Sequence, residues 1–263
     1  MGGPHAGRRG NPDLGAAGGD VRASAWGAGA DWMLERVPTL LGAADDWGSL
    51  DVRAYPGLVR VLRAHPGLRL ARTELIMDSL VPAIIEQRVT GLQARRAWRR
   101  LLMKYGDPAP GPAPAGMRVP PPARVLLDVP AWDWSRWDVD LHRRRAVRAA
   151  ATVAGRLEEC AGLGLSEAAA RLQLVPGVGV WTAAETTQRA LGDPDAVSVN
   201  DYHVHNQVVF ALTGRPRGSD EEMLELLEPW AGQRQRVVRL IEVARIAAPR
   251  FGPRHRLDRP PGS

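Results

Sequence analysis

The sequence predicts an all-α protein, and three observations support this fold class. Apolar residues recur at helical spacing along most of the chain, and the strict alternation typical of strands is scarce. Glycine or proline interrupts the apolar pattern at intervals that suit the ends of helices. The 263 residues, 44 % of them hydrophobic and 24 % charged, are enough to bury a core of this kind.

The two ends of the chain differ in composition from the part between them. Residues 1–25 are rich in glycine and polar residues, and we expect a disordered tail there. They lack the apolar segment of a secretory signal. Residues 251–263 are expected to form a second, flexible tail. No apolar run approaches the roughly 18 residues of a membrane span, so we expect no membrane partner.

The first half of the chain is expected to be helical up to a proline-rich connector. Pro82 is expected to kink the helix that runs from Thr73 to Val89, and Gly106 is expected to end the helix that follows it. The connector near 107–124 has no residues that would contribute to a core. The expected elements are a helical region over 27–70, a helix from Thr73 to Val89 and a helix over 91–106.

The second half is expected to be helical as well. A long basic helix is predicted to end at Gly162 or Gly164, and Ser219 with Glu222 has the spacing of a capping box. The predicted helices are those over 140–164, 166–174, 181–192, 202–214 and 219–247.

Cysteine and histidine residues give no sign of a metal centre. Cys160 is the only cysteine, which excludes an internal disulfide and a four-cysteine zinc site and weakly favours the reducing cytoplasm. His203 and His205, two residues apart on a helix, would point to different faces. We expect no metal ligands here.

The charge of the chain favours a polyanionic partner. The formal net charge is +6 and the isoelectric point about 10.5. Nearly all the positive charge is arginine, since Lys104 is the only lysine. A GC-rich genome would produce the same bias, so charge alone leaves both explanations open.

A Pro-Gly-Val-Gly turn between two helices is the first candidate for a binding site. Gly177 and Gly179 permit a tight hairpin, and the helix that follows at once would offer unpaired N–H groups beside them. Such a helix start is a ready site for phosphate. An ordinary corner between helices is the alternative.

Asp201 follows the hairpin helix after one short loop. Its carboxylate could face the same bound backbone as the hairpin. The alternative is an N-cap for the next helix, a role that Asn200 could share.

Residues 172–206 resemble the helix-hairpin-helix DNA glycosylase superfamily, and more narrowly the bacterial 3-methyladenine DNA glycosylase II (AlkA-like) family. The block AIIEQRVTGLQARRAWRRL, residues 83–101, is similar to a second segment of that family. The resemblance covers roughly residues 27–250. It implies a two-lobed helical glycosylase domain over 26–250 and suggests that the N-terminal β domain of well-known members is missing here.

The resemblance also assigns roles to individual residues. Asp201 aligns with the catalytic aspartate, Gln87 with a glutamine of the base pocket, and Trp181 with a pocket aromatic. Arg88 stands where relatives insert a wedge into DNA, although a solvated surface arginine is the alternative. The implied substrate-binding residues are Trp181, Gln87, Tyr202 and Arg88, and the implied DNA-binding residues are Gly177, Val178, Gly179 and Thr182.

The activity implied is that of a monofunctional glycosylase of base excision repair, which flips an alkylated purine out of DNA and hydrolyses its glycosidic bond. Bifunctional members have a lysine two residues after the second hairpin glycine, where this chain has Trp181. No cofactor is implied beyond the monovalent cation often found at the hairpin. The expected partner is double-stranded DNA with damaged bases, bound by a nucleoid-associated monomer. A glycosylase for uracil or oxidised purines, and a non-catalytic damage sensor, remain alternatives.

Overall fold

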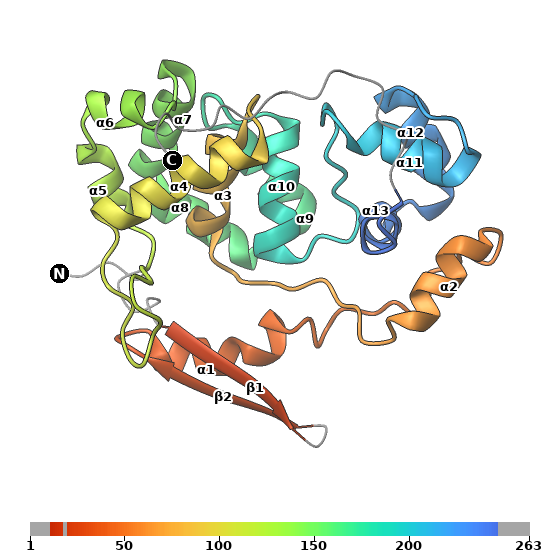
Figure 1. Cartoon of the computed structure of the whole chain (residues 1–263), viewed down its shortest axis with the longest axis horizontal. Coiled ribbons are helices and arrows are strands. Elements are labelled where there is room, and N and C mark those ends of the chain that lie inside the picture. Colours follow the sequence, from red (N-terminus) through yellow and green to blue (C-terminus); the bar gives the residue numbers. More distant parts are fainter. Residues whose placement is uncertain (1–10, 18–19, 247–263) are drawn as a thin grey trace, which may run out of the picture.

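The computed structural model describes residues 11–17 and 20–246, and within them it is mainly helical (Figure 1). The predicted all-α fold class is confirmed. No helix in these residues is long and apolar enough to cross a membrane. The α-helices are α1 (Ala30–Leu40), α2 (Pro56–Ala64), α3 (Ile76–Glu86), α4 (Gly91–Tyr105), α5 (Ala123–Asp128), α6 (Ala131–Arg136), α7 (Leu141–Thr152), α8 (Ala154–Glu158), α9 (Leu165–Gln173), α10 (Val180–Leu191), α11 (Val204–Thr213), α12 (Asp220–Leu227) and α13 (Arg234–Val243).

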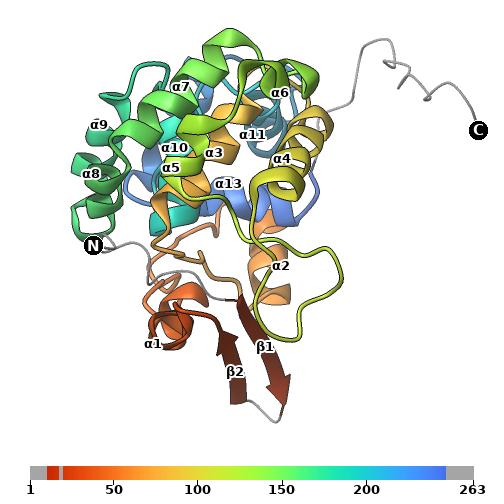
Figure 2. The same cartoon turned by 90° about the vertical axis from the view of Figure 1, so that its left-hand side faces the viewer.

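A β-hairpin near the N-terminus corrects the expectation of a disordered tail over 1–25. β1 (Asn11–Ala17) and β2 (Asp20–Trp26) pair antiparallel and lie beside α1 (Figures 1 and 2). The composition of residues 11–26 does not predict these strands, because a contact with a residue far along the chain supports them. The Trp26 ring lies against Gly111, where a Cβ would come within 2.4 Å of the indole. Residues 1–10 and the tail predicted over 251–263 lie outside the described residues.

The larger of two hydrophobic clusters is built around α3, whose residues are mostly buried. α3 packs against α4, α7, α8 and α10. It begins at Ile76, three residues later than expected, because Glu74 adopts a φ of 56° and its N–H donates to the Ala190 carbonyl. Thr90 and Gln93 form a capping box for α4, and Gly106 ends that helix as predicted.

The basic helix expected over 140–164 is instead divided. α7 ends at Thr152, α8 follows after Val153, and a 3-10 turn spans Glu159–Gly162. The break at Val153 redirects the chain so that Leu157 and Cys160 are buried in the cluster around α3.

The second hydrophobic cluster joins the two ends of the described chain. Trp47, Leu50 and Leu58 pack with residues of α11, α12 and α13. The Trp230 indole donates a 2.6 Å hydrogen bond to the Asp51 carbonyl. In Figure 1 the orange α2 accordingly lies beside the blue α13, which it contacts.

Candidate active site

The Pro-Gly-Val-Gly turn forms a tight hairpin between α9 and α10. The Val178 N–H donates to the Val175 carbonyl at 2.9 Å. Gly177 has a φ of 89°, and a Cβ there would lie 2.7 Å from the Cβ of Ala146 on α7. Position 177 therefore requires glycine both for its backbone conformation and for its packing.

Gly179 differs from Gly177, because the space that a side chain would occupy there is open. It precedes α10 with a φ of −100°, and a Cβ there would meet nothing within 4 Å. Within the described residues no side chain caps the start of α10. The first N–H groups of this helix are thus free for an anion, and nothing blocks a close approach beside Gly179.

Gln87 ties the end of α3 to the hairpin. Its Nε2 donates to the Gly177 carbonyl at 2.9 Å and to the Thr182 hydroxyl at 2.8 Å. The buried Arg143 of α7 supports the same segment by donating to the Ile85 carbonyl at 2.8 Å. The amide predicted to line a base pocket is therefore engaged in positioning the hairpin.

Asp201 lies at the start of α11 and beside the first turn of α10. Its Oδ1 accepts from the N–H groups of His203 at 2.7 Å and Val204 at 3.1 Å, at the start of α11. Its Oδ2 accepts from the Trp181 indole at 3.2 Å. The carboxylate therefore caps a helix and faces the first turn of α10 at the same time. The sequence assigned separate roles to Asp201 and Trp181 and did not predict this hydrogen bond between them.

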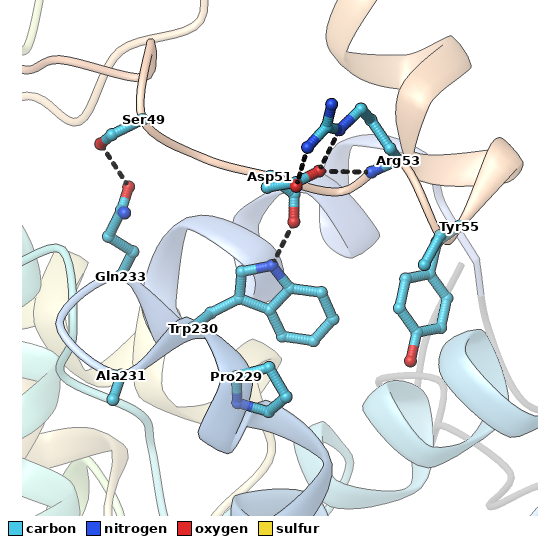
Figure 3. A pocket seen from close by; sticks show the side chains of 9 residues that line it. Ser49, Asp51, Arg53, Tyr55, Pro229, Trp230, Ala231 and Gln233 are labelled. Carbon is cyan, nitrogen blue, oxygen red and sulfur yellow. Dashed lines mark hydrogen bonds and ion pairs between the residues drawn. The ribbon is translucent and has the colours of Figure 1, made fainter.

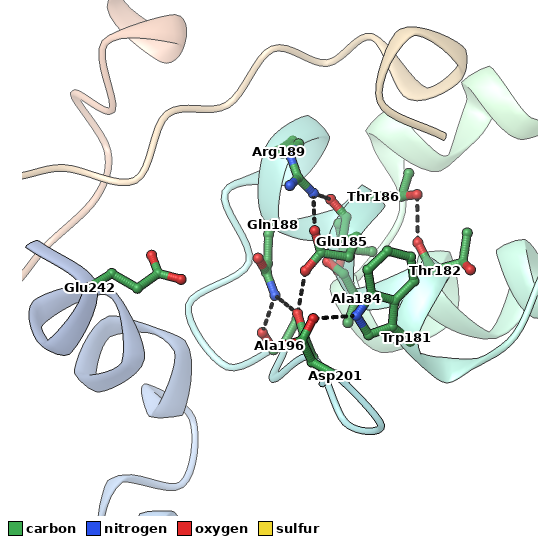
Figure 4. A network of polar contacts seen from close by, with 12 residues as sticks. Trp181, Thr182, Ala184, Glu185, Thr186, Gln188, Arg189, Ala196, Asp201 and Glu242 are labelled. Atoms are coloured by element: carbon green, nitrogen blue, oxygen red, sulfur yellow. Dashed lines mark hydrogen bonds and ion pairs between the residues drawn. The ribbon is translucent and has the colours of Figure 1, made fainter. Parts of the chain in front are cut away.

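A network of polar side chains on α10 holds the loop that carries Asp201 (Figure 4). Gln188 donates to the Ala196 carbonyl at 2.8 Å and to the Ser198 hydroxyl at 2.9 Å, and this hydroxyl donates to Glu185. Glu185 also pairs with Arg189 at 2.5 Å. These residues were not predicted from the sequence. The spacing of Trp181, Glu185 and Arg189 by four residues was the available signal, since it places them on one face of the helix.

Glu86 is a second residue near this site that the sequence analysis did not single out. It ends α3 directly before Gln87 and is half-buried. Burial raises the pKa of its carboxyl above the usual value, and the negative charges of Glu185 and Asp201 add to the effect. In the described part of the chain its carboxylate has no hydrogen bond or ion pair.

The other predicted site residues are divided between surface and interior. Tyr202 is 83 % exposed, with its ring edge against His203, and Arg88 is exposed with a φ of 57°. The side chains of Val178 and Thr182 are buried, so only the backbone of these two residues could reach DNA.

Lys104 lies in another cluster. Its ammonium donates to both oxygens of the buried Asp133 at 2.7 and 2.6 Å, and these bonds lower the pKa of that carboxyl. Tyr105 donates to the same carboxylate. Burial and this bond raise the pKa of Tyr105 to about 12.

Neither a metal-ligand cluster nor a cavity forms part of this arrangement in the described residues. No group of three or more potential metal ligands occurs among the residues that the structure describes. A cavity of about 600 Å³ opens beside Tyr55 and Trp230 (Figure 3), and none of the predicted site residues lines it.

No family model matches the chain. A probable bifunctional transcriptional activator/DNA repair enzyme AlkA from Mycobacterium tuberculosis is 33 % identical over 150 residues. The match covers 56 % of this chain and 30 % of that relative, so the chain spans less than a third of its length.

Solved structures give broader coverage at lower identity. An 8-oxoguanine glycosylase/lyase of Clostridium acetobutylicum, in complex with double-stranded DNA, matches with a TM-score of 0.65 at 15 % identity, over 90 % of this chain and 87 % of that chain. A 3-methyladenine DNA glycosylase from Archaeoglobus fulgidus matches with a TM-score of 0.64 at 18 % identity, over 86 % and 79 %. The chain therefore has the fold of the helix-hairpin-helix DNA glycosylases, and its resemblance to the AlkA-like members of that superfamily is confirmed.

Proposed function

We propose that this protein is a monofunctional DNA glycosylase of base excision repair that removes alkylated purines from double-stranded DNA. The observation that carries the proposal is the placement of Asp201, whose carboxylate is held by Trp181 and by the start of α11 one short loop after the hairpin helix. The AlkA relative and the fold support the same function.

DNA binding would begin at the hairpin. A phosphate would lie beside Gly179 and accept hydrogen bonds from the free N–H groups of the first turn of α10. Because a stacked base is out of reach, the damaged nucleotide must rotate out of the duplex, which costs a few kcal/mol. The exposed Arg88, next to Gln87, would then occupy the space that the nucleotide leaves.

The chemical step would use the carboxylate of Asp201. As the glycosidic bond breaks, its electron pair goes to the base, and an alkylated purine thereby loses its positive charge. The sugar becomes an oxocarbenium ion, which the negative charge of Asp201 stabilises. Water then attacks C1′ and releases a proton to Asp201 or to solvent.

The proposal of a monofunctional enzyme rests on the placement of lysine. Lys104 is the only lysine, and its ammonium is held by the buried Asp133 of α6, whereas the position beside Asp201 belongs to Trp181. Without an amine at that position, water is the nucleophile. We therefore expect an abasic site as product, with no strand cleavage by the enzyme.

A monovalent cation at the hairpin would need carbonyl oxygens as ligands. The Gly177 carbonyl accepts one hydrogen bond from Gln87 and keeps a second lone pair, so it could supply one of these ligands. The ion would reinforce the attraction for phosphate. The carboxylate chemistry described above does not involve it.

The test is release of methylated bases from alkylated duplex DNA by the natural chain and by Asp201→Asn. Asparagine keeps an oxygen that can accept from His203 and Val204, so the fold should survive. Asp128→Asn, at an exposed position on α5, is the matched control. We expect release of 3-methyladenine by the natural chain and the control only. Binding without release by all three proteins would favour a damage sensor, and a panel of uracil and oxidised purines would identify a glycosylase for another lesion.

A further inference from the structure

The segment that carries Asp201 is held mainly by hydrogen bonds, because the side chains on either side of it pack little. Asn200, Tyr202 and His203 are all exposed. Asn200 adopts a φ of 67°, and its N–H donates to Oδ2 of Asp220 at 3.0 Å, at the start of α12. The position of the Asp201 carboxylate therefore depends on polar contacts with neighbouring elements.

His205, in the first turn of α11, contacts the backbone of Asp201. Its side chain is only 21 % exposed, and its Nδ1 lies 2.9 Å from the Asp201 carbonyl oxygen. A carbonyl only accepts hydrogen bonds, so Nδ1 must carry a proton and donate it. The helix itself begins at Val204, so this carbonyl lies before the helix and is bonded by a side chain of its first turn.

Asn206 determines what the other ring nitrogen of His205 does. Its Oδ1 accepts from the Gly218 N–H at 3.1 Å, so its Nδ2 is the atom that faces Nε2 of His205, at 2.8 Å. Nε2 must then accept, without a proton of its own. Oδ1 of Asp220 lies 4.0 Å from Nδ1, and its negative charge favours a proton on that nitrogen. These contacts agree on a neutral imidazole whose single proton points at the Asp201 carbonyl.

The bond from His205 fixes the backbone between Asp201 and the groups that hold its carboxylate. Two N–H groups at the start of α11 donate to Oδ1, and the Trp181 indole donates to Oδ2. Because a peptide bond is planar, a fixed carbonyl also fixes the N–H of Tyr202 and the direction in which the chain continues towards α11. Without this bond the peptide after Asp201 could turn, and the carboxylate would lose its alignment with Trp181.

We propose that His205 is a positioning residue, which holds the Asp201 carboxylate in place through the backbone carbonyl of Asp201. The inference rests on the proposed function and adds to it a residue outside the hairpin. His205 does not take part in bond breaking, since both of its ring nitrogens are bonded to groups of the protein. Its loss should therefore slow the chemical step and leave DNA binding nearly unchanged.

The experiment removes the imidazole and then restores only the donor to the carbonyl. His205→Phe keeps a ring but has no nitrogen. His205→Asn places an amide N–H about where Nδ1 lies in histidine, so it can donate to the Asp201 carbonyl, but it does not reach Asn206. Because His205→Phe leaves polar groups unpaired, His205→Gln, whose amide lies about where Nε2 does, is a second loss variant. His65→Gln, at an exposed histidine after α2, is the matched control.

Two measurements are made on each protein. Release of 3-methyladenine from alkylated duplex DNA gives kcat and KM. The NMR signal of the Trp181 indole N–H, assigned from its loss in Trp181→Phe, shows without DNA or turnover whether Oδ2 of Asp201 is in place.

We expect both loss variants to lower kcat about 5- to 10-fold, as loss of a hydrogen bond between neutral groups predicts, with KM nearly unchanged. Their Trp181 indole N–H should exchange faster with solvent. His205→Asn should recover kcat and the indole signal of the natural chain, although it also lacks the bond to Asn206. His65→Gln should change neither property.

Unchanged kcat in the loss variants, or an equal loss in His205→Asn, would overturn the role of His205. A rise in KM alone would also overturn it, because it would mean that His205 contacts DNA. If the natural chain releases no base but its Trp181 signal depends on a donor at position 205, the proposed chemistry is wrong and the positioning of Asp201 stands. If it releases the base and the Trp181 signal is the same in every variant at position 205, the proposed function stands and the positioning is wrong.

Discussion

The Trp181 indole donates its N–H to Oδ2 of Asp201 across 3.2 Å. From the resemblance to the superfamily, Trp181 is expected at the position where bifunctional members carry their lysine, and in the structure its side chain holds the carboxylate of Asp201. The pair joins the hairpin helix directly to the proposed catalytic group.

Loss of this hydrogen bond should slow the chemical step. Trp181→Phe keeps an aromatic ring but leaves Oδ2 without its donor, and a hydrogen bond to a charged group contributes roughly 1.5–3 kcal/mol. We expect kcat for release of 3-methyladenine to fall about 10-fold or more, with DNA affinity nearly unchanged. Single-turnover kinetics and equilibrium binding measure the two effects. A loss of affinity alone would mean that Trp181 contacts the base without orienting Asp201.

A lysine at position 181 should convert the mechanism. Trp181→Lys would place an amine beside Asp201, where it can attack C1′ as the base leaves and form a Schiff base. We expect borohydride to trap a covalent complex of this variant with DNA, and none with the natural chain. Trp181→Arg, which has a positive charge but no comparable nucleophile, is the control. Trapping of the natural chain would contradict the monofunctional mechanism.

The two hairpin glycines should respond differently to alanine. Gly177→Ala forces a φ of 89° on alanine and brings its Cβ within 2.7 Å of Ala146, so we expect a destabilisation of roughly 1–3 kcal/mol. Gly179→Ala meets no protein atom within 4 Å and has an ordinary φ, so stability should be retained.

Of these two variants, Gly179→Ala is the one expected to lose DNA affinity while it keeps its stability. The new methyl group at position 179 would stand where a phosphate approaches the N–H groups of α10, so folded Gly179→Ala should bind DNA more weakly, and least tightly at high salt. Thermal unfolding and fluorescence anisotropy measure the two properties. Full DNA affinity in Gly179→Ala would place the phosphate site elsewhere.

Glu86→Gln should stabilise the fold at alkaline pH. The pKa of Glu86 is raised in the folded state, so the folded chain holds this proton more tightly than the unfolded chain does. The resulting stabilisation is present at low pH and is lost as the pH rises through the pKa of the folded state. Glutamine does not ionise, so the variant does not lose stability in this way as the pH rises. Its melting temperature should therefore exceed that of the natural chain near pH 8, and the difference should vanish as the pH falls below the usual range of glutamate. A difference independent of pH would point to packing instead of charge.

The sequence predicted those parts of the site that are close together in the chain. The hairpin, α10 and Asp201 lie within about thirty residues, and their order was enough to suggest phosphate binding and a facing carboxylate. Gln87 was expected in a base pocket, but its bonds to Gly177 and Thr182 were not predicted, because they depend on how α3 packs against the hairpin.

Other features could not be predicted because their cause lies far away in the chain. The β-hairpin over 11–26 has the composition of a flexible segment, and the contact of Trp26 with Gly111 supports it. Glu86 looked like an ordinary helix residue, since only the folded chain brings it near Glu185 and Asp201. In both cases the deciding neighbour is more than 80 positions away.

The two hydrophobic clusters impose an order on folding during synthesis. The cluster around α3 draws its residues from 76–191, a continuous stretch that can be buried as soon as it has left the ribosome. The other cluster combines Trp47, Leu50 and Leu58 with residues as late as Ile241. The apolar side chains of the early segment must therefore stay exposed until residues as late as Ile241 have been made. Closing a loop of this length also makes that step slow, so nascent chains should be most vulnerable to aggregation and proteolysis at residues 47–62.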